Sequence, residues 1–76
     1  MAFSNYIKEI RTKMLLSQED FAKETNVSVA TINRWENAKT KPNITAMRHI
    51  REFCLKNGLD FGYLESEWLE SGGRNE

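Results

Sequence analysis

One stretch decides the fold: LLSQEDFAKETNVSVATINRWENAKTKP (Leu15–Pro42). It contains two short segments with helical periodicity, separated only by TNVS. Ser17 and Ser28 are placed to cap these helices, because a serine hydroxyl accepts a hydrogen bond from a first-turn backbone N–H. Asn26 stands at the turn, and asparagine tolerates the left-handed backbone conformation better than most residues other than glycine. The stretch therefore predicts two helices joined by a tight turn, the second spanning Val29–Asn37.

Helical periodicity also appears on both sides of this stretch. Around residues 4–14, Ile7, Ile10 and Met14 recur at three- and four-residue spacing. Asn43 is placed to cap a later helix. The expected buried stripe of that helix is Ile44, Met47, Ile50 and Cys54, with Phe53 and Leu55 on its flanks.

A fifth, shorter helix is predicted after Gly58. That glycine is placed to end the preceding helix, with Leu59 packing back as in a Schellman motif. Asp60 then caps a segment whose apolar residues are Phe61, Leu64, Trp68 and Leu69. Strand signals are nearly absent. We expect an all-α domain of five helices over residues 1–70, and a disordered tail at residues 71–76, which has nothing to bury.

The net charge is zero, but the charges are unevenly distributed. Residues 1–51 carry nine Lys or Arg against five Asp or Glu, a net charge of +4, whereas residues 52–76 carry two against six, a net charge of −4. The electrostatic field near a surface depends on the local patch, so a basic first two-thirds favours a nucleic-acid partner. The alternative is a solvated surface whose charges are merely uneven.

The single cysteine, Cys54, excludes an internal disulfide. It lies in an apolar pattern, which favours a buried small side chain over a reactive thiol. No apolar run is long enough to span a membrane, and the N-terminus has no secretory signal pattern. We expect a soluble, cytoplasmic protein.

The helix at residues 28–37 presents an unusual outward face. Ile32 and Trp35, with the preceding Val27, supply its inward side. The outward positions are Ser28, Val29, Ala30, Asn33, Arg34 and Asn37. None of them is a carboxylate, whereas a merely solvated helix face usually carries Glu as well as Lys. The composition therefore favours a binding face.

This face has the chemistry that the major groove of DNA requires. Val29 and Ala30 are slim enough to approach base edges and apolar enough to meet thymine methyl groups. Asn33 and Arg34 carry the amide and guanidinium groups that pair with adenine or guanine. With Ser28, these four form the predicted base-reading set, and double-stranded DNA is the predicted partner.

Four further polar side chains are expected to contact the sugar-phosphate backbone. Gln18 stands at the start of the helix that precedes the turn, and Asn37, Lys39 and Lys41 lie in the loop after residues 28–37. Amides, cations and helix N-termini are the groups that phosphates bind.

The same stretch closely resembles the lambda-repressor-like (Cro/Xre) helix-turn-helix family. The family pattern has a Leu-Ser-Gln-Glu opening, an Ala in the second helix, a Gly-Val-Ser-type turn and Ile-x-x-Trp-Glu-x-Gly-x-x-x-Pro at the end. The corresponding parts occur here in order, and the resemblance covers roughly residues 3–58. It implies a five-helix lambda-repressor-like DNA-binding domain whose second and third helices form the helix-turn-helix. It also implies a transcriptional regulator that reads a DNA sequence with residues 28–37.

The resemblance assigns roles to individual positions. Gln18 matches the usual phosphate or base-edge contact, residues 29, 30, 33 and 34 match base-reading positions, and residues 37, 39 and 41 match backbone contacts. An ion pair between Arg11 and Glu36 is also implied. Two family glycines are replaced, by Asn26 in the turn and by Ala38 after the third helix. A positive φ at Ala38 would cost on the order of 1 kcal/mol, so either Asn37 takes that conformation or the loop closes differently.

Neither catalysis nor a cofactor is predicted. Trp35 and Trp68 fit a helical core better than a ligand-stacking site. His49 has no Cys, His or carboxylate at metal-ligand spacing, so we interpret it as structural or solvated. No nucleophile–base pair, phosphate-binding glycine loop or paired catalytic carboxylate occurs. We therefore expect no enzymatic activity and no metal.

Two expectations concern the acidic C-terminal helix. The first is an alternative to DNA binding: the chain would be a protein-interaction module on the same fold, antitoxin-like or a phage regulatory partner. Leu64, Trp68 and Leu69 would then anchor the partner protein. For a DNA-binding protein, residues 61–70 are expected to join a homodimer: Phe61 and Leu64 would close the core, while Trp68 and Leu69 would meet their symmetry mates. The alternative is that Trp68 folds back onto its own chain.

Overall fold

The computed structural model describes residues 2–70 and 74–75. Its helices are α1 (Ala2–Lys13), α2 (Gln18–Thr25), α3 (Val29–Glu36), α4 (Ile44–Lys56) and α5 (Phe61–Glu70). Two short strands, β1 (Thr40–Lys41) and β2 (Arg74–Asn75), pair in parallel. The prediction of an all-α, five-helix fold is confirmed. None of the helices in the described part of the chain is long and apolar enough to cross a membrane.

The C-terminal segment differs from the sequence expectation at two residues. Arg74 pairs with Thr40, and Asn75 pairs with Lys41, where disorder was predicted. The rest of the predicted tail, residues 71–73 and 76, lies outside the described residues. A two-residue strand has no period-2 pattern to detect, because its stabilisation comes from backbone groups of the neighbouring strand.

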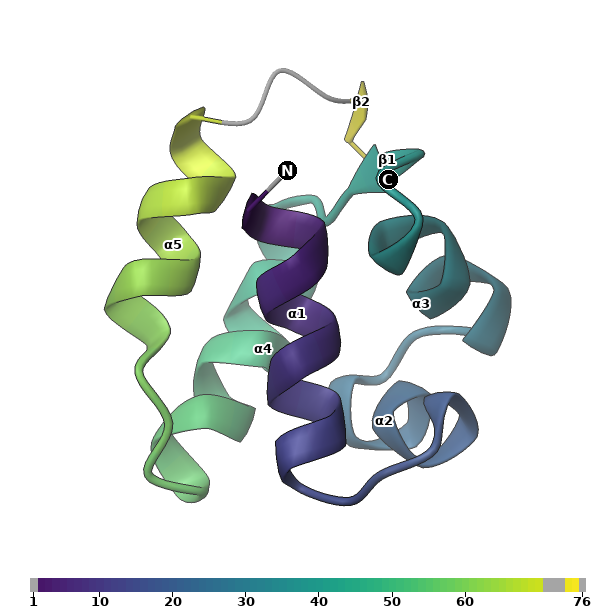
Figure 1. Cartoon of the computed structure of the whole chain (residues 1–76), viewed down its shortest axis with the longest axis vertical. Coiled ribbons are helices and arrows are strands. Elements are labelled where there is room, and N and C mark those ends of the chain that lie inside the picture. Colours follow the sequence, from purple (N-terminus) through teal and green to yellow (C-terminus); the bar gives the residue numbers. More distant parts are fainter. Residues whose placement is uncertain (1, 71–73, 76) are drawn as a thin grey trace.

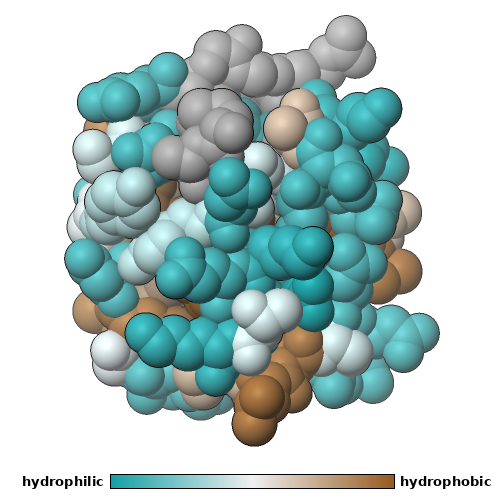
Figure 2. Space-filling view, in the orientation of Figure 1, coloured by the Kyte–Doolittle hydropathy of each residue, from teal (hydrophilic) through white to brown (hydrophobic). Residues whose placement is uncertain are grey.

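The helices pack around one shared core. In Figure 1, α1 runs down the middle with α4 behind it, α5 lies on one side, and α2 and α3 lie on the other. Direct contacts join α1 to α3 and α5, and join α2 to α3 and α4. The face seen in Figure 2 is mainly hydrophilic, with an apolar patch at its lower edge, where the chain passes from α1 to α2.

All five helices contribute to the core. Its buried members include Ile7 and Ile10 of α1, Phe21 of α2, Ile32 and Trp35 of α3, Met47, Ile50, Phe53 and Cys54 of α4, and Leu64 of α5. The prediction was wrong for Ile44, which is 61% exposed, and Phe53 is buried at 4% exposure rather than flanking. At about 100° per residue, the stripe formed by Met47, Ile50 and Phe53 leaves Ile44 to one side.

Cys54 is fully buried, as its apolar surroundings in the sequence predicted. Burial raises the pKa of the Cys54 thiol to about 11, and the nearby Asp60 carboxylate adds to the shift. The thiol is therefore neutral at neutral pH and packs as a small apolar group.

Polar side chains start three of the helices at the predicted residues. The side chains of Ser17, Ser28 and Asn43 each accept a hydrogen bond from the backbone N–H three residues later, at 3.1, 3.1 and 2.8 Å. Asp60 Oδ1 makes the equivalent, longer contact with the N–H of Tyr63 at 3.3 Å. These bonds satisfy N–H groups that have no partner within the helix.

The first four helices all end in the same way. A residue with a positive φ lies one position beyond α2, Asn26 at 59°, and two positions beyond α1, α3 and α4: Leu15 at 60°, Ala38 at 59° and Gly58 at 69°. The next backbone N–H then donates to the carbonyl five residues earlier, for example Lys39 to Arg34 at 2.9 Å and Leu59 to Cys54 at 2.8 Å. This is the Schellman arrangement. Ala38 itself takes the conformation that the family glycine would take, whereas Asn37 has a φ of −100°.

Replacing Ala38 by glycine should therefore stabilise the domain. Removal of the Cβ relieves the left-handed backbone, and we expect the free energy of unfolding to rise by about 0.5–1 kcal/mol in urea denaturation. Ala30→Gly is the matched control, since residue 30 is an exposed position inside α3 and the same change there should cost about 1 kcal/mol. A lower melting temperature for Ala38→Gly would mean that the positive φ is not a source of strain.

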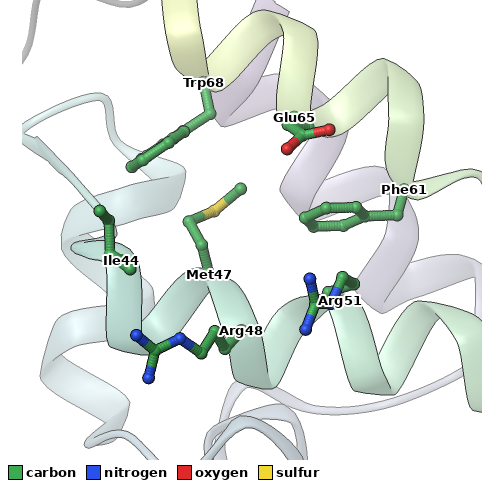
Figure 3. Close-up of a pocket in the computed structure, with 7 residues that line it drawn as sticks. All are labelled: Ile44, Met47, Arg48, Arg51, Phe61, Glu65 and Trp68. Atoms are coloured by element: carbon green, nitrogen blue, oxygen red, sulfur yellow. The ribbon is translucent and has the colours of Figure 1, made fainter.

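The end of α5 is anchored to the loop between α3 and α4. Trp68 Nε1–H donates to the Pro42 carbonyl oxygen at 2.7 Å. Lys41 Nζ lies 5.3 Å from the centre of the indole and donates to the Trp68 carbonyl oxygen at 3.3 Å. The indole also closes one end of a groove between α4 and α5, with Met47 at the centre and Phe61 at the other end (Figure 3).

This placement bears on Trp68, whereas a homodimer through residues 61–70 stays a prediction. The alternative, in which Trp68 packs on its own chain, is the arrangement observed. The reason is the carbonyl of Pro42, which offers the indole N–H an acceptor inside the domain. Of the two residues expected at a dimer contact, only Leu69 is largely exposed, at 68%.

Trp68→Phe tests this anchor. It removes the hydrogen bond to Pro42 and should lower the free energy of unfolding by about 1 kcal/mol. Leu69→Ala, one residue further along, should change it by no more than about 0.5 kcal/mol, because that side chain is exposed. Equal effects of the two variants in urea denaturation would show that the anchor adds nothing.

Candidate nucleic-acid interface

Helices α2 and α3 are held at a tight turn. Asn26 ends α2 in the left-handed conformation, and Ser28 Oγ caps α3 two residues later. On its inner side, α3 buries Ile32 and Trp35 completely, with Val27 packed against the same core. The opposite side of α3 is left at the surface.

The predicted base-reading residues lie together on this outer side. Val29 is 42% exposed, and Ser28, Ala30 and Asn33 are also exposed. Arg34 is half-buried, and its Nη2 donates to Thr31 Oγ1 at 3.3 Å. Their grouping is a consequence of helical spacing, since positions three and four apart share a face.

Thr31 has a role that the sequence did not indicate. Its hydroxyl lies 2.9 Å from the Ser28 hydroxyl and accepts from the Arg34 guanidinium. Thr31 thus joins the cap of α3 to the guanidinium that is expected to read a base. The spacing of three residues between Thr31 and Arg34 was the available signal, because side chains at i and i+3 are neighbours on a helix.

The one carboxylate of α3 is turned inward. Glu36 is 4% exposed at its side chain and accepts from Arg11 twice, from Nε at 2.6 Å and from Nη2 at 3.0 Å. Arg11 Nη1 also donates to the carbonyl oxygen of Leu16 at 2.9 Å. The ion pair implied by the family resemblance is thus present, and it links α1 to the end of α3.

Gln18 belongs to the same network. Gln18 is the first residue of α2, and its Nε2 donates to Glu36 Oε1 at 3.0 Å. This hydrogen bond orients the Gln18 side chain. The side chain is half-buried. Its predicted contact with phosphate stays a prediction, and any such contact has to coexist with this hydrogen bond.

The residues of the loop after α3 that are predicted to contact the DNA backbone differ in their exposure. Asn37 and Lys39 are exposed, although Asn37 Nδ2 donates to the Asn33 carbonyl oxygen at 2.8 Å. Lys41 is half-buried against Trp68. Lys39 is therefore the cation of this loop that is presented beside α3, whereas Lys41 contacts α5.

Among residues 2–70 and 74–75, no cluster of three or more His, Cys, Asp and Glu residues could hold a metal ion.

These elements define a class: a small helical domain in which two short helices joined by a tight turn present the second helix at the surface. The chain belongs to the helix-turn-helix family, whose model matches residues 7–58.

One curated relative is the HTH-type transcriptional activator BcrR of Enterococcus faecalis, which is 34% identical over 53 residues. That match covers 70% of the present chain and 26% of the relative, so the chain spans about a quarter of the relative's length. No solved structure is significantly similar to the chain.

The Arg11–Glu36 pair should show strong coupling. Arg11→Met leaves a buried carboxylate without its cation and should cost about 3 kcal/mol in the free energy of unfolding. Adding Glu36→Gln should recover part of that loss, because the uncompensated charge is gone. Additive effects of the two substitutions in urea denaturation would contradict this coupling.

The exposed pair of Glu24 and Lys56 supplies the control. Their charged atoms are 3.7 Å apart, and the side chains are 43% and 71% exposed. Lys56→Met should therefore change the free energy of unfolding by less than about 1 kcal/mol.

Proposed function

We propose that this protein is a sequence-specific transcriptional regulator that reads the major groove of double-stranded DNA with α3. The observation that carries the proposal is the outer side of α3, where slim and amide side chains are exposed beside the half-buried Arg34, and the only carboxylate of α3, Glu36, faces inward. Such a face can approach the negatively charged groove without repulsion from its own acidic groups.

Different side chains would contact the bases and the sugar-phosphate backbone of the DNA. Val29 and Ala30 would make close apolar contact with base edges, and Asn33 and Arg34 would supply paired hydrogen bonds. Lys39 and Asn37 would contact phosphates next to α3, as would the start of α2 at Gln18. The net charge of +4 on residues 1–51 supports this orientation.

The relative supports a role in transcription, because its printed description is a transcriptional activator. We infer that the present protein also regulates transcription by occupying an operator, in the cytoplasm of a prokaryotic cell. A single reading helix contacts only a few base pairs, so we further infer that two copies bind two half-sites about one helical turn apart.

A protein-interaction module is the second candidate function. The exposed Leu69 beside Glu70, at the end of an acidic α5, is the observation in its favour. Two of the three anchors expected for such a module, Leu64 and Trp68, are however used within the chain: Leu64 is fully buried and Trp68 bonds to Pro42. Of the three expected anchors only Leu69 remains exposed, so DNA is the better-supported partner.

Selection of bound sequences from a random duplex library, followed by affinity measurements at two salt concentrations, tests the proposal. Arg34→Ala should cost roughly 1–3 kcal/mol and relax the preference at one base position in each half-site. Lys39→Ala should weaken binding to all sequences alike and reduce the salt slope by about one unit. If no sequence is enriched and binding is insensitive to salt, the proposed function is wrong. A selected motif with a single half-site would overturn binding by two copies only.

A further inference from the structure

The groove between α4 and α5 has a volume of about 250 Å³ and an apolar floor. Met47 of α4 lies at its centre, and the rings of Phe61 and Trp68 of α5 stand at its two ends (Figure 3). Both rings are only partly buried, so apolar surface is left open in the groove. Phe61 and Trp68 are seven residues apart, which is roughly 10 Å along the helix. The floor therefore suits a short apolar group.

Charged side chains border this floor on both sides. Arg48 and Arg51 line the groove from α4, and Glu65 lines it from α5. Figure 3 shows the two guanidinium groups on the α4 side and the carboxylate on the α5 side, with the side chains of Met47 and Phe61 between them. All three charged residues are exposed. Within the described part of the chain, none of the three forms an ion pair or a side-chain hydrogen bond. Their charges are therefore available to a ligand.

These charges define the polar groups of a complementary ligand. A guanidinium group binds a carboxylate through paired hydrogen bonds, so the α4 side fits a carboxylate. The Lys41 ammonium, 5.3 Å from the centre of the Trp68 ring, adds positive charge near one end. On the α5 side, Glu65 would repel a second carboxylate and fits an ammonium group instead. A ligand with one carboxylate, one ammonium group and a short apolar body would match both sides and the floor.

The size of the groove favours a small molecule over a partner protein. Seven residues line it, whereas a stable protein–protein interface involves about 20–30 residues on each side. Sites for drug-sized ligands have volumes of roughly 300–1,000 Å³ and combine a mostly apolar lining with a few polar groups that fix orientation. The groove has this composition at a slightly smaller volume, so the ligand that fits is of amino-acid size.

We propose that the groove binds a free apolar amino acid in its zwitterionic form. Arg48 and Arg51 hold the carboxylate, and Glu65 holds the ammonium group. The apolar side chain packs on Met47 between the two aromatic rings. This site goes beyond the proposed function and does not depend on it, because the residues that line the groove are outside the predicted DNA-contacting set.

The indole N–H signals in nitrogen-15 NMR spectra provide the test, with L-leucine as the probe. The chain has two tryptophans, and Trp68→Phe identifies the signal of Trp68. Leucine should move the Trp68 signal to saturation, because that indole lines the groove. The signal of Trp35, which is completely buried in the core, should stay in place.

Two analogues of leucine test the two charged groups of the ligand. 4-Methylpentanoate lacks the ammonium group, and 3-methylbutylamine lacks the carboxylate. At constant ionic strength, each should bind more weakly than leucine by roughly three- to tenfold, because each loses one charged contact. If 4-methylpentanoate binds as tightly as leucine, the ammonium group plays no part and the zwitterion proposal is wrong.

Substitutions assign the contacts to residues. Glu65→Gln should weaken leucine by a similar factor but leave the affinity for 4-methylpentanoate unchanged or higher, because the repelling charge is gone. Arg51→Gln should weaken leucine and 4-methylpentanoate alike. Glu70→Gln and Lys56→Gln are the matched controls, since both residues are exposed on the same two helices and neither lines the groove. Equal leucine affinity in Glu65→Gln and Glu70→Gln would contradict the proposed role of Glu65.

Thermal denaturation gives an independent readout. Leucine should raise the melting temperature of the unaltered protein, because a ligand that binds only the folded state stabilises it. Arg51→Gln should lose most of this increase, and Lys56→Gln should keep it.

Two results would overturn the proposal outright. In the first, leucine up to its solubility limit moves neither the Trp68 signal nor the melting temperature. In the second, the Trp68 signal shifts with protein concentration and leucine has no effect, which would mean that a second copy of the chain covers the groove. Failure to bind DNA would overturn the proposed function, while the leucine titration would still decide the amino-acid site.

Discussion

The carboxylate of Glu36 is the point on which the rest of the domain depends. It lies at the end of α3, is almost fully buried, and accepts from Arg11 of α1 and from Gln18 of α2. One charged group thus sets the position of three helices. A buried ion pair is a weak source of net stability, but its directional hydrogen bonds restrict geometry. Here the restriction has two results: α3 cannot rotate about its axis without breaking these bonds, and its outer side is kept free of negative charge.

The short helices α2 and α3 depend on the capping of their ends as much as on the packing of their side chains. Eight residues are too few for a stable isolated helix, so α2 and α3 depend on caps and on buried side chains such as Phe21 and Trp35. Serine caps supply acceptors at the two starts, and left-handed residues close the two ends. Because both ends of α3 are fixed in this way, its exposed side chains have a defined position relative to the rest of the domain.

What could be predicted from the sequence is mostly what is decided locally. Ser17, Ser28, Asn43 and Gly58 act within a few residues of their own positions, so they indicated the helix ends correctly. The faces of α3 followed from its periodicity. Contacts between distant segments could not be obtained in this way: the acceptor for Trp68 is 26 residues away at Pro42, and Gln18 meets Glu36 across the turn.

The position of Lys41 has a thermodynamic consequence. Its ammonium group lies over the Trp68 ring and donates to the carbonyl oxygen at the end of α5, and a cation held there is not available at the same position to an anion in solution. Lys41 therefore couples two equilibria: docking of the end of α5, and capture of an anion by the loop between α3 and α4. Such coupling is reciprocal. An anion that draws Lys41 away weakens the docking of α5, and any molecule that lifts the end of α5 increases the affinity of the loop for anions by the same factor.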